Sequence, residues 1–447
     1  MIDLSDPDLS DPPQRIGKYR VIRRLGEGTT SEVFLCHDEF NDRQVAVKRV
    51  RASVLGDAAD AHVFARFFAS EAALAGRLHH PNVVDILDAV PDPRAPYVVM
   101  EYVPGTTLRA FCAPDHLLPL DQVVEIGFKC AMALGYCYRQ GLIHRDVKPA
   151  NILTVGSDRE VRDIKLTDFG SALNLRSDET QVHRVGSLAY MSPEQLDGAE
   201  LDARADIYGL GAVLYHLIAG HAPFEASSQA SLMHQICHVE PPSLVGVRTG
   251  VSPALDRVVR RCLAKRADDR HPSWEALGEA LSGLIAMQHV PRGAVQGVLD
   301  SERFTLLRTL DFFTRFGDIA LWEVVHRARW ERLPAGQALY RRGEEGRTFH
   351  IIATGTLEVW RDGRRVALLG SGTSVGEMAY LAPNPELRVH STDVIVTDSA
   401  TTISFTPDTL ARLSPATRHL FDEAFIRVLV RRLHAAHEAL AHPRRIL

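Results

Sequence analysis

The chain has 447 residues, about three times the roughly 150 residues of a typical domain, which indicates two or three folded units. Hydrophobic residues make up 45% and charged residues 24%, a balance typical of folded globular proteins that excludes wholesale disorder. Lysine and arginine number 51 against 56 aspartates and glutamates, so the formal net charge of -5 gives no basis for binding nucleic acid or anionic lipid.

The cysteines and the apolar runs indicate in which compartment the protein is expected to function. Six cysteines are scattered along the chain without any C-x-x-C pair, which argues against a zinc site and against a disulfide framework. The N-terminal stretch MIDLSDPDLSDPP is acidic and broken by prolines, unlike a signal or transit peptide, and no apolar run reaches the roughly 18 residues of a membrane helix. These features predict a cytoplasmic protein that binds neither membrane nor nucleic acid.

The first 285 residues change character twice. Residues 1–18 carry four aspartates and three prolines, too polar to form a core, and are predicted to be a disordered tail. Over residues 19–50, runs of alternating apolar residues separated by turn residues predict short antiparallel strands. Residues 64–78 and most of 120–285 have apolar residues at helical spacing. We therefore expect a small β lobe followed by a larger helical lobe.

A second domain is predicted beyond a linker. Residues 286–303 contain Pro and Gly without any sustained periodicity. Helical stretches over 306–316 and 319–329 then precede short strands between regularly spaced glycines, a rhythm typical of a small β-roll. A helix with an apolar stripe closes the chain over 421–440. The second domain is expected over 304–441, and the whole chain is expected to be α+β.

A glycine-rich turn between two predicted strands carries Gly26 and Gly28. Glycines there let backbone amides approach phosphate oxygens, although an ordinary hairpin turn fits this stretch equally well on its own. Lys48 follows on the next strand but one, and Glu71 on the ensuing helix offers a carboxylate to hold it. Because an unpaired ammonium on a buried strand is unfavourable, a phosphate-binding lysine is favoured over a solvated one.

Three motifs further along carry the decisive signal: His144-Arg-Asp-Val-Lys-Pro-Ala-Asn151, Thr167-Asp-Phe-Gly170 and Met191-Ser-Pro-Glu194. They resemble the catalytic loop, the metal-binding loop and the end of the activation segment of the bacterial eukaryotic-like (Hanks-type) protein kinases. Agreement of several independent motifs in the right order is not expected by chance. The resemblance covers residues 19–285 and implies the bilobal protein kinase fold.

The resemblance implies a role for each polar residue of these loops. Asp146 accepts the proton of the substrate hydroxyl, and Lys148 stabilises the transferring phosphoryl oxygens. Asn151 and Asp168 supply oxygen ligands to the Mg²⁺ that accompanies ATP. Lysine at position 148, with no arginine in the style of tyrosine kinases, is similar to serine/threonine kinases. The implied reaction is transfer of the ATP γ-phosphoryl to hydroxyl groups of a protein substrate.

The adenine site follows from the same resemblance. The run Met100-Glu-Tyr-Val103 resembles the hinge between the lobes, where backbone groups of Glu101 and Val103 read the adenine edge. In that family apolar side chains enclose the ring, which here are those of Val33, Ala46 and Leu153.

Other residues are implied to act on the catalytic loop from outside it. Arg145 resembles an arginine that answers a phosphate in the activation segment, for which Thr180 is best placed, although acidic neighbours can supply part of the charge. Ser187 stands where such kinases brace Asp146 with a hydroxyl. Two further residues are assigned structural roles: Asp206, which supports the catalytic loop, and Arg270, which pairs with Glu194.

The last third of the chain resembles a cyclic-nucleotide-binding domain, and the run Gly376-Glu-Met-Ala carries the resemblance. It implies that amides near Gly376 cradle a cyclic phosphate, that Glu377 binds the ribose 2′-hydroxyl, and that Arg388 pairs with the phosphate. Arg388 lies slightly farther along the chain than usual and is followed by bulky Val389 and His390. Two alternatives stay open: a site for a cyclic nucleotide or another small ligand, and a β-roll that serves a homodimer.

The function predicted from the sequence is a serine/threonine protein kinase that uses ATP and Mg²⁺ and is regulated by its C-terminal domain. The competing prediction is a nucleotide-binding scaffold or pseudokinase whose β-roll serves dimerisation. Complete catalytic motifs favour the enzyme.

Overall fold

The computed structural model describes residues 13–28, 31–51, 76, 78–91, 95–157, 160–169, 188–293 and 298–441. The chain divides into two compact units, Met1–Gln296 and Gly297–Leu447, and the division lies within the predicted linker. The greater part of the predicted tail and nearly all of the helix predicted over 64–78 lie outside the described residues, so both stay predictions.

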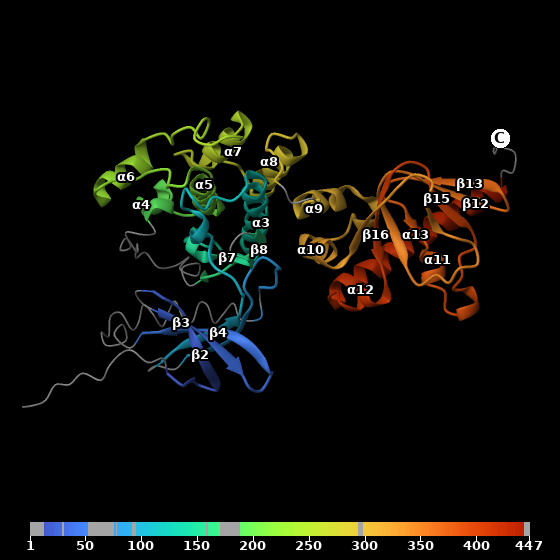
Figure 1. Cartoon of the computed structure of the whole chain (residues 1–447), viewed down its shortest axis with the longest axis horizontal. Coiled ribbons are helices and arrows are strands. Elements are labelled where there is room, and N and C mark those ends of the chain that lie inside the picture. The colour runs from blue at the N-terminus through green and yellow to red at the C-terminus, as the bar shows by residue number, and fades with distance from the viewer. Residues whose placement is uncertain are drawn as a thin grey trace, which may run out of the picture. The chain divides into compact units, whose positions relative to one another are not determined.

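The first unit opens with a six-stranded antiparallel sheet in the order β1-β2-β3-β4-β6-β5 (Figure 1). Its strands β1 to β6 span Arg15–Ile16, Tyr19–Glu27, Ser31–Asp38, Arg43–Val50, Ile86–Val90 and Tyr97–Glu101. The alternation of apolar residues over 19–50 thus corresponds to β2, β3 and β4. Their inward side chains, among them Phe34, Val45 and Val47, form the core of this lobe.

The sheet begins inside the segment 1–18 that the sequence analysis assigned to a disordered tail. Ile16 of β1 pairs with Tyr19 of β2 across a tight turn at Gly17, whose φ is 54°. Ile16 and Tyr19 are only 4% and 2% exposed. Burial of this apolar pair attaches the strand to the sheet, and a strand of two residues is too short to give an alternating pattern.

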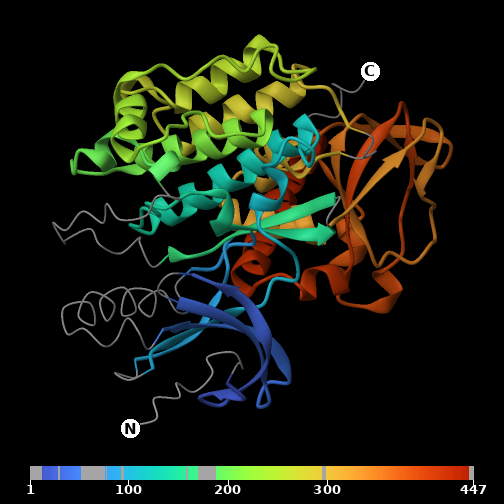
Figure 2. The same ribbon diagram turned by 60° about the vertical axis from the view of Figure 1, so that its left-hand side comes forward.

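Helices form the larger lobe of the first unit (Figure 1, Figure 2). The helices α3 to α8 span Leu120–Arg139, Pro193–Leu196, Ala203–Ala219, Gln229–His238, Pro253–Cys262 and Trp274–Ala286. Single 3-10 turns lie at Leu108–Phe111, Pro149–Asn151, Leu188–Tyr190 and Ala267–Asp269. A hairpin of β7 (Ile152–Ser157) and β8 (Glu160–Leu166) lies between α3 and α4 in the chain.

Helix α5 is the centre of this lobe. It is buried on almost every face because α3 and α7 both pack on it. The Asp202 side chain caps its first turn by accepting from the Arg204 amide, and the helix ends at Gly220, whose φ of 80° suits glycine. The apolar run at residues 210–219 therefore belongs to a core helix. No described helix is both long and apolar enough to cross a membrane.

The second unit contains two four-stranded antiparallel sheets, β10-β15-β12-β13 and β14-β11-β16-β9. The strands β9 to β16 span Arg329–Leu333, Ala338–Tyr340, Phe349–Thr354, Leu357–Arg361, Arg364–Leu369, Ser374–Val375, Asp393–Val396 and Ala400–Phe405. The helices α9 to α13 span Asp300–Thr309, Asp318–Arg327, Glu377–Tyr380, Pro407–Ala411 and Pro415–Ala441, with 3-10 turns at Asp311–Phe313 and Pro385–Leu387. This is the predicted β-roll with helices before and after it.

Helix α13 packs on the roll by one face only. Phe425 lies against Phe349 with ring centroids 4.9 Å apart, and Phe421 meets Phe405 edge-on at 5.0 Å. Leu433, by contrast, is 58% exposed. The apolar stripe predicted along this helix is therefore split, with its first turns in the core and its later turns at the surface.

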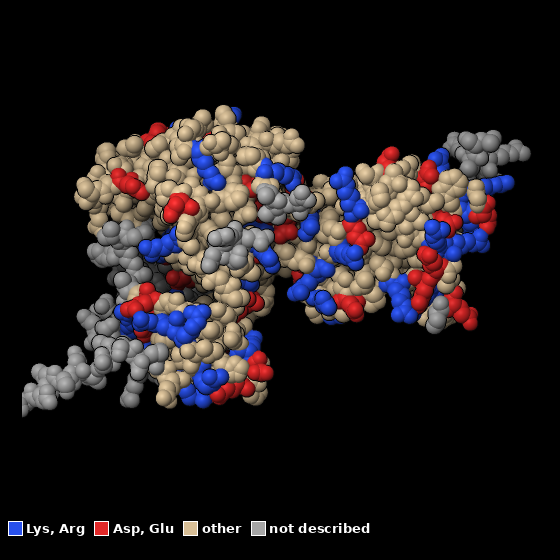
Figure 3. Space-filling model, in the orientation of Figure 1, with Lys and Arg blue, Asp and Glu red and all other residues tan. Residues whose placement is uncertain are grey.

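The structure shows where the charged side chains and the cysteines lie. On the face in Figure 3, basic and acidic side chains are interspersed over both units. All six cysteines are unpaired, and five of them are buried.

Candidate functional site

The loop between α3 and β7 holds the backbone of His144 and Arg145 in an unusual conformation. Arg145 has a φ of 65°, which a non-glycine residue adopts only when its surroundings enforce it. The buried Asp206 carboxylate of α5 accepts from the backbone N–H of His144 at 2.6 Å and of Arg145 at 2.7 Å. Burial raises the pKa of Asp206, and the two amides supply hydrogen bonds that compensate the buried carboxylate. The predicted support of this loop by Asp206 thus has a direct geometric basis.

Three polar side chains of this loop converge. Lys148 Nζ contacts Asp146 Oδ2 at 2.6 Å, and Asn151 Nδ2 donates to the same oxygen at 3.0 Å. Asn151 Nδ2 also donates to the Asp146 carbonyl at 2.9 Å. These contacts fix the orientation of the Asp146 carboxyl group at the edge of the site, where it is 20% exposed.

Lys48 of β4 and Asp168 bring the two lobes together. Lys48 Nζ lies 2.6 Å from Asp168 Oδ1. The Lys48 ammonium holds the pKa of the Asp168 carboxyl well below its usual range, at about 2, so this carboxylate is ionised at neutral pH. Glu71, the partner predicted for Lys48, lies outside the described residues.

Asp168 is strained and held beside the catalytic loop. Its φ is 66°. The amide of the preceding Thr167 donates to the Asn151 carbonyl at 2.9 Å, and the His144 ring contacts the Thr167 carbonyl at 3.0 Å. His144 also packs on Phe169, with ring centroids 4.8 Å apart. Asn151 and Asp168 are therefore neighbours.

These two residues fit a divalent cation. The Asn151 amide nitrogen is committed to Asp146, which leaves its side-chain carbonyl oxygen as the ligand atom, and the Asp168 carboxylate is ionised. Such oxygen atoms are the ligands that Mg²⁺ prefers, and Mg²⁺ takes few protein ligands because it binds phosphate oxygens and water as well. No cluster of three His, Cys, Asp or Glu side chains suited to a metal occurs in the described part of the chain.

The glycine-rich strand and its neighbours align several predicted residues in one row. Gly26 pairs with Val33, and Val33 pairs with Lys48 across β2, β3 and β4. The Gly28 amide donates to the Ser31 carbonyl at 2.8 Å, which closes the turn. Ala46 pairs with Met100 on the adjacent β6. The residues predicted to enclose a nucleotide thus lie on adjoining strands.

The hinge strand ends at Glu101, and its side chain has partners that the sequence analysis did not foresee. Lys165 Nζ of β8 contacts Glu101 Oε1 at 2.5 Å, and the Asp85 amide donates to the same oxygen at 2.9 Å. The carboxylate therefore ties the hinge to both lobes, which leaves only backbone groups of this residue for a ligand. Val103 lies two residues beyond, and Leu153 is the second residue of β7, where it forms a bridge with Thr107.

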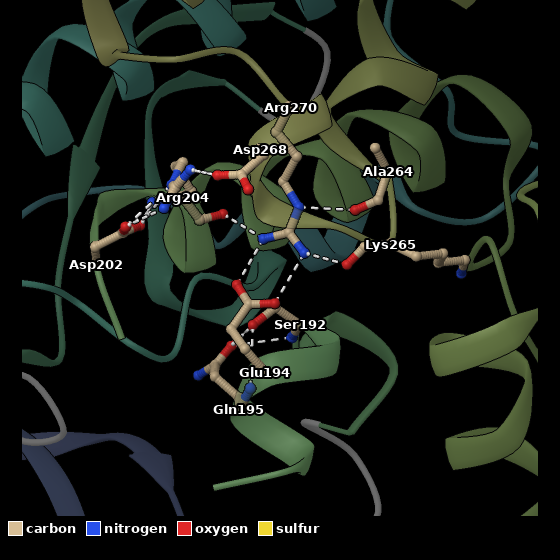
Figure 4. Close-up of polar contacts among 9 residues, drawn as sticks. All are labelled: Ser192, Glu194, Gln195, Asp202, Arg204, Ala264, Lys265, Asp268 and Arg270. Carbon is tan, nitrogen blue, oxygen red and sulfur yellow. Dashed lines mark hydrogen bonds and ion pairs between the residues drawn. The ribbon is translucent and has the colours of Figure 1, made fainter. Parts of the chain in front are cut away.

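Arg270 and Glu194 form a buried bidentate pair (Figure 4). The two distances are 2.6 and 2.8 Å, and the Arg270 side chain has no exposed surface. The neighbouring Gln195 donates from Nε2 to the Arg145 carbonyl at 2.8 Å. This network attaches α4 to the catalytic loop. Thr180 and Ser187 lie outside the described residues.

In the second unit the predicted ligand residues Glu377 and Arg388 each contact other parts of the domain. Gly376, with a φ of 84°, and Glu377 begin α11, and Glu377 is fully buried. Its carboxylate forms an ion pair with Arg432 of α13. Arg388 is exposed, and its Nε donates to the Ala382 carbonyl at 3.1 Å. The pair with Arg432 was missed because no local pattern marks it.

Comparison with known proteins identifies both regions. Residues 19–280 match the family described as protein kinase domain, and residues 330–414 match the cyclic nucleotide-binding domain. The serine/threonine-protein kinase PknB of Mycobacterium leprae is 36% identical over 308 residues, which cover 67% of this chain and 48% of that protein.

Two further relatives are similar over the same region. The probable serine/threonine-protein kinase SCO3848 of Streptomyces coelicolor is 31% identical over 318 residues, 67% of this chain and 46% of that protein. The crystal structure of the Mycobacterium tuberculosis PknI kinase domain is 30% identical and covers 60% of this chain and 97% of that one, with a TM-score of 0.47. The chain spans about half the length of the curated relatives it matches.

Proposed function

The chain belongs to the protein kinase family, and we propose that it is a serine/threonine protein kinase that transfers the γ-phosphoryl of ATP to hydroxyl groups of a protein substrate. The observation that supports this most strongly is the convergence of Lys48 from the sheet and Asp168, Asn151, Asp146 and Lys148 from the helical lobe. A protein that only binds nucleotide does not require a carboxylate such as Asp146 to be oriented by a lysine such as Lys148.

Each of these groups suits one task in phosphoryl transfer. Lys48, now paired with Asp168, would supply a cation to the phosphate oxygens of a bound nucleotide. Asp168 and Asn151 would hold Mg²⁺, which neutralises the charge that develops on the phosphates. Lys148 places a second cation at the transferring group and also keeps Asp146 oriented. Most of the rate gain in this chemistry comes from such positioning and charge.

Asp146 is proposed to accept the proton of the substrate hydroxyl. Its Oδ2 is held by Lys148 and Asn151, so the carboxyl group is fixed before a substrate arrives. The backbone that carries it is fixed in turn by Asp206. A general base works only when it lies within hydrogen-bond reach of the proton it removes, and this double support provides that alignment.

The adenine is proposed to bind the backbone of Glu101 and Val103 beneath Val33, Ala46 and Leu153. Because the Glu101 carboxylate is engaged by Lys165, the hinge backbone is held in place without occupying the space for the ring.

The test compares Asp146→Asn with wild-type protein in transfer from radiolabelled Mg-ATP to the chain itself and to a generic protein substrate. Asn keeps the shape and removes the base, so we expect transfer to fall by at least about 10²-fold while ATP binding is retained. Asp115→Asn, an exposed carboxylate, is the matched control and should leave transfer unchanged. Equal transfer by wild type and Asp146→Asn, or ATP binding without transfer by wild type, would support the scaffold instead.

The second domain is proposed to regulate the kinase. The sequence left open whether it does so through a small ligand or through a homodimer. The exposed later turns of α13, with Leu433 at the surface, offer an apolar face for a second copy. The contacts of Glu377, described below, are relevant to whether this domain binds a cyclic nucleotide.

A further inference from the structure

One oxygen of the carboxylate that the cyclic-nucleotide resemblance assigns to a ribose is already paired within the chain, and the other, Oε2, is buried without a hydrogen-bond partner among the described residues. Arg432 Nη1 forms an ion pair with Glu377 Oε1, and Arg432 Nη2 donates to the Ser374 carbonyl at 2.7 Å. The Glu377 side chain is 1% exposed and that of Arg432 41%. The guanidinium therefore lies on the solvent side of the carboxylate, where an incoming hydroxyl would have to approach.

Aromatic side chains fill the neighbouring space. The rings of Tyr340 and His390 stack with centroids 3.8 Å apart, and both residues are less than 10% exposed. A Cβ built on Gly376 would clash with the Tyr340 hydroxyl, and one built on Gly346 would lie 3.0 Å from the His390 ring. The Tyr340 hydroxyl is held by the Thr348 carbonyl at 2.9 Å. The turn that should cradle a phosphate is thus packed against the chain's own side chains.

Arg388, the residue predicted to meet the phosphate, is fastened elsewhere. Its carbonyl accepts from the Gly346 amide at 2.7 Å, and its Nε donates to Ala382. Two more backbone bonds fix His390, two residues beyond: its N–H donates to the Glu344 carbonyl at 2.9 Å, and its carbonyl accepts from the Gly343 N–H at 2.8 Å. The backbone around Arg388 is thereby fixed, and its side chain is oriented toward the Ala382 carbonyl.

We propose that the Arg432 side chain occupies the cyclic-nucleotide site of this domain. Its guanidinium closes the site from within the chain and attaches α13 to the turn between β14 and α11. The domain consequently does not bind cyclic nucleotides.

The chemistry of the exchange supports the closed state. A nucleotide would replace the ion pair between Glu377 and Arg432 by a hydrogen bond from a neutral ribose hydroxyl, which brings no cation to the buried carboxylate. If its phosphate drew Arg432 away, Glu377 would be left buried without a cation, which is strongly unfavourable. Burial raises the pKa of Glu377, and the nearby Arg432 guanidinium acts against that rise.

The first measurement is calorimetric titration of the full chain with cyclic AMP and with cyclic GMP up to millimolar concentration. We expect no binding of either. Binding that is saturable in this range and is lost in Glu377→Gln would overturn the proposal, because it would show that the carboxylate is available to a ribose. Neither titration depends on kinase activity, so a result that overturns this proposal can be distinguished from one that overturns the proposed kinase function.

The second measurement is hydrogen exchange of the segments 374–381 and 425–433. Arg432→Ala should raise their exchange rates at least about ten-fold, because α13 loses its attachment. Arg431→Ala is the matched control on the same helix: Arg431 pairs with Asp311 and both are more than half exposed, so exchange should stay within about two-fold. Equal exchange in the two variants would overturn the proposal.

A double variant distinguishes loss of the ion pair from general unfolding of the domain. Arg432→Gln together with Glu377→Gln replaces the ion pair by a neutral amide pair of similar size. We expect exchange of both segments to return toward the wild-type rate, whereas Arg432→Gln alone should remain fast. A double variant as fast as the single one would mean that the two residues do not act as a pair.

Discussion

The buried pair of Arg270 and Glu194 permits a quantitative prediction. A guanidinium has five N–H donors, and the five contacts of Arg270 go to the two oxygens of Glu194 and to the carbonyls of Arg204, Ala264 and Lys265 (Figure 4). Every donor is thus used at a position without solvent access. Arg270→Met would keep the apolar stem and remove all five.

The magnitude follows from what Arg270→Met leaves behind. Glu194, 18% exposed, would lose its cation, and three carbonyls would lose a donor. Breaking one side of a buried ion pair typically costs about 3–5 kcal/mol. For a domain of this size 1 kcal/mol corresponds to about 2–4 °C, so the melting temperature of the first unit should fall by about 6–20 °C.

Differential scanning calorimetry of the full chain measures the effect, and Arg266→Met provides the control. Arg266 is 78% exposed and lies 3.9 and 3.8 Å from Asp268 and Asp269, a surface arrangement that contributes less than about 1 kcal/mol. A fall no larger for Arg270→Met than for Arg266→Met would refute the reasoning, because the buried network would then contribute nothing beyond a surface pair.

The remaining predictions concern the site and the second domain. Lys48→Met and Asp168→Ala should each reduce phosphoryl transfer by about 10³-fold or more with melting temperature nearly unchanged, and a collapse of the melting temperature would identify a structural pair instead. Thr180→Ala should lower activity if its phosphate is the partner of Arg145, and mass spectrometry after incubation with Mg-ATP should find that phosphate; full activity without it would mean that acidic neighbours suffice. Burial lowers the pKa of His350 to about 4 from its ordinary 6.5, so the folded state binds this proton less tightly than the unfolded one. Stability of the second domain should therefore fall by up to about 3 kcal/mol as pH drops from about 6.5 through 4, and this slope should be absent in His350→Asn.

Local patterns in the sequence sufficed for the architecture. Alternation over residues 19–50 predicted β2, β3 and β4, and glycine spacing predicted the second, strand-rich domain. The catalytic motifs predicted the kinase family, which the comparisons confirm. These features depend on neighbours within a few residues, so a single sequence carries them.

Contacts between distant elements could not be predicted in the same way. Lys165 and Glu101 are 64 residues apart, and Arg432 and Glu377 are 55 apart. Each of these charged residues is ordinary for a surface strand or helix when considered alone. The pairs exist because tertiary packing brings two faces together, and no periodicity or local motif records which faces meet.

Backbone strain separates the catalytic region from ordinary turns. Asp42 and Asp362 have φ of 46° and 51°, but both lie in hairpin turns, where aspartate adopts this region readily. Gln288, with a φ of 55°, lies just after the end of α8. Arg145, at 65°, lies instead within the catalytic loop, and Asp168, at 66°, lies two residues beyond the end of β8. Such strain costs about 1–3 kcal/mol per residue and persists only where the surroundings enforce it. For Arg145 the enforcing group is Asp206, through two amide hydrogen bonds, and for Asp168 a major contact is the ammonium of Lys48. Strain held by the buried Asp206 at Arg145 and by the ion pair with Lys48 at Asp168 is difficult to explain as a requirement of folding. It is what a site needs when its carboxylates must be oriented before the substrate arrives.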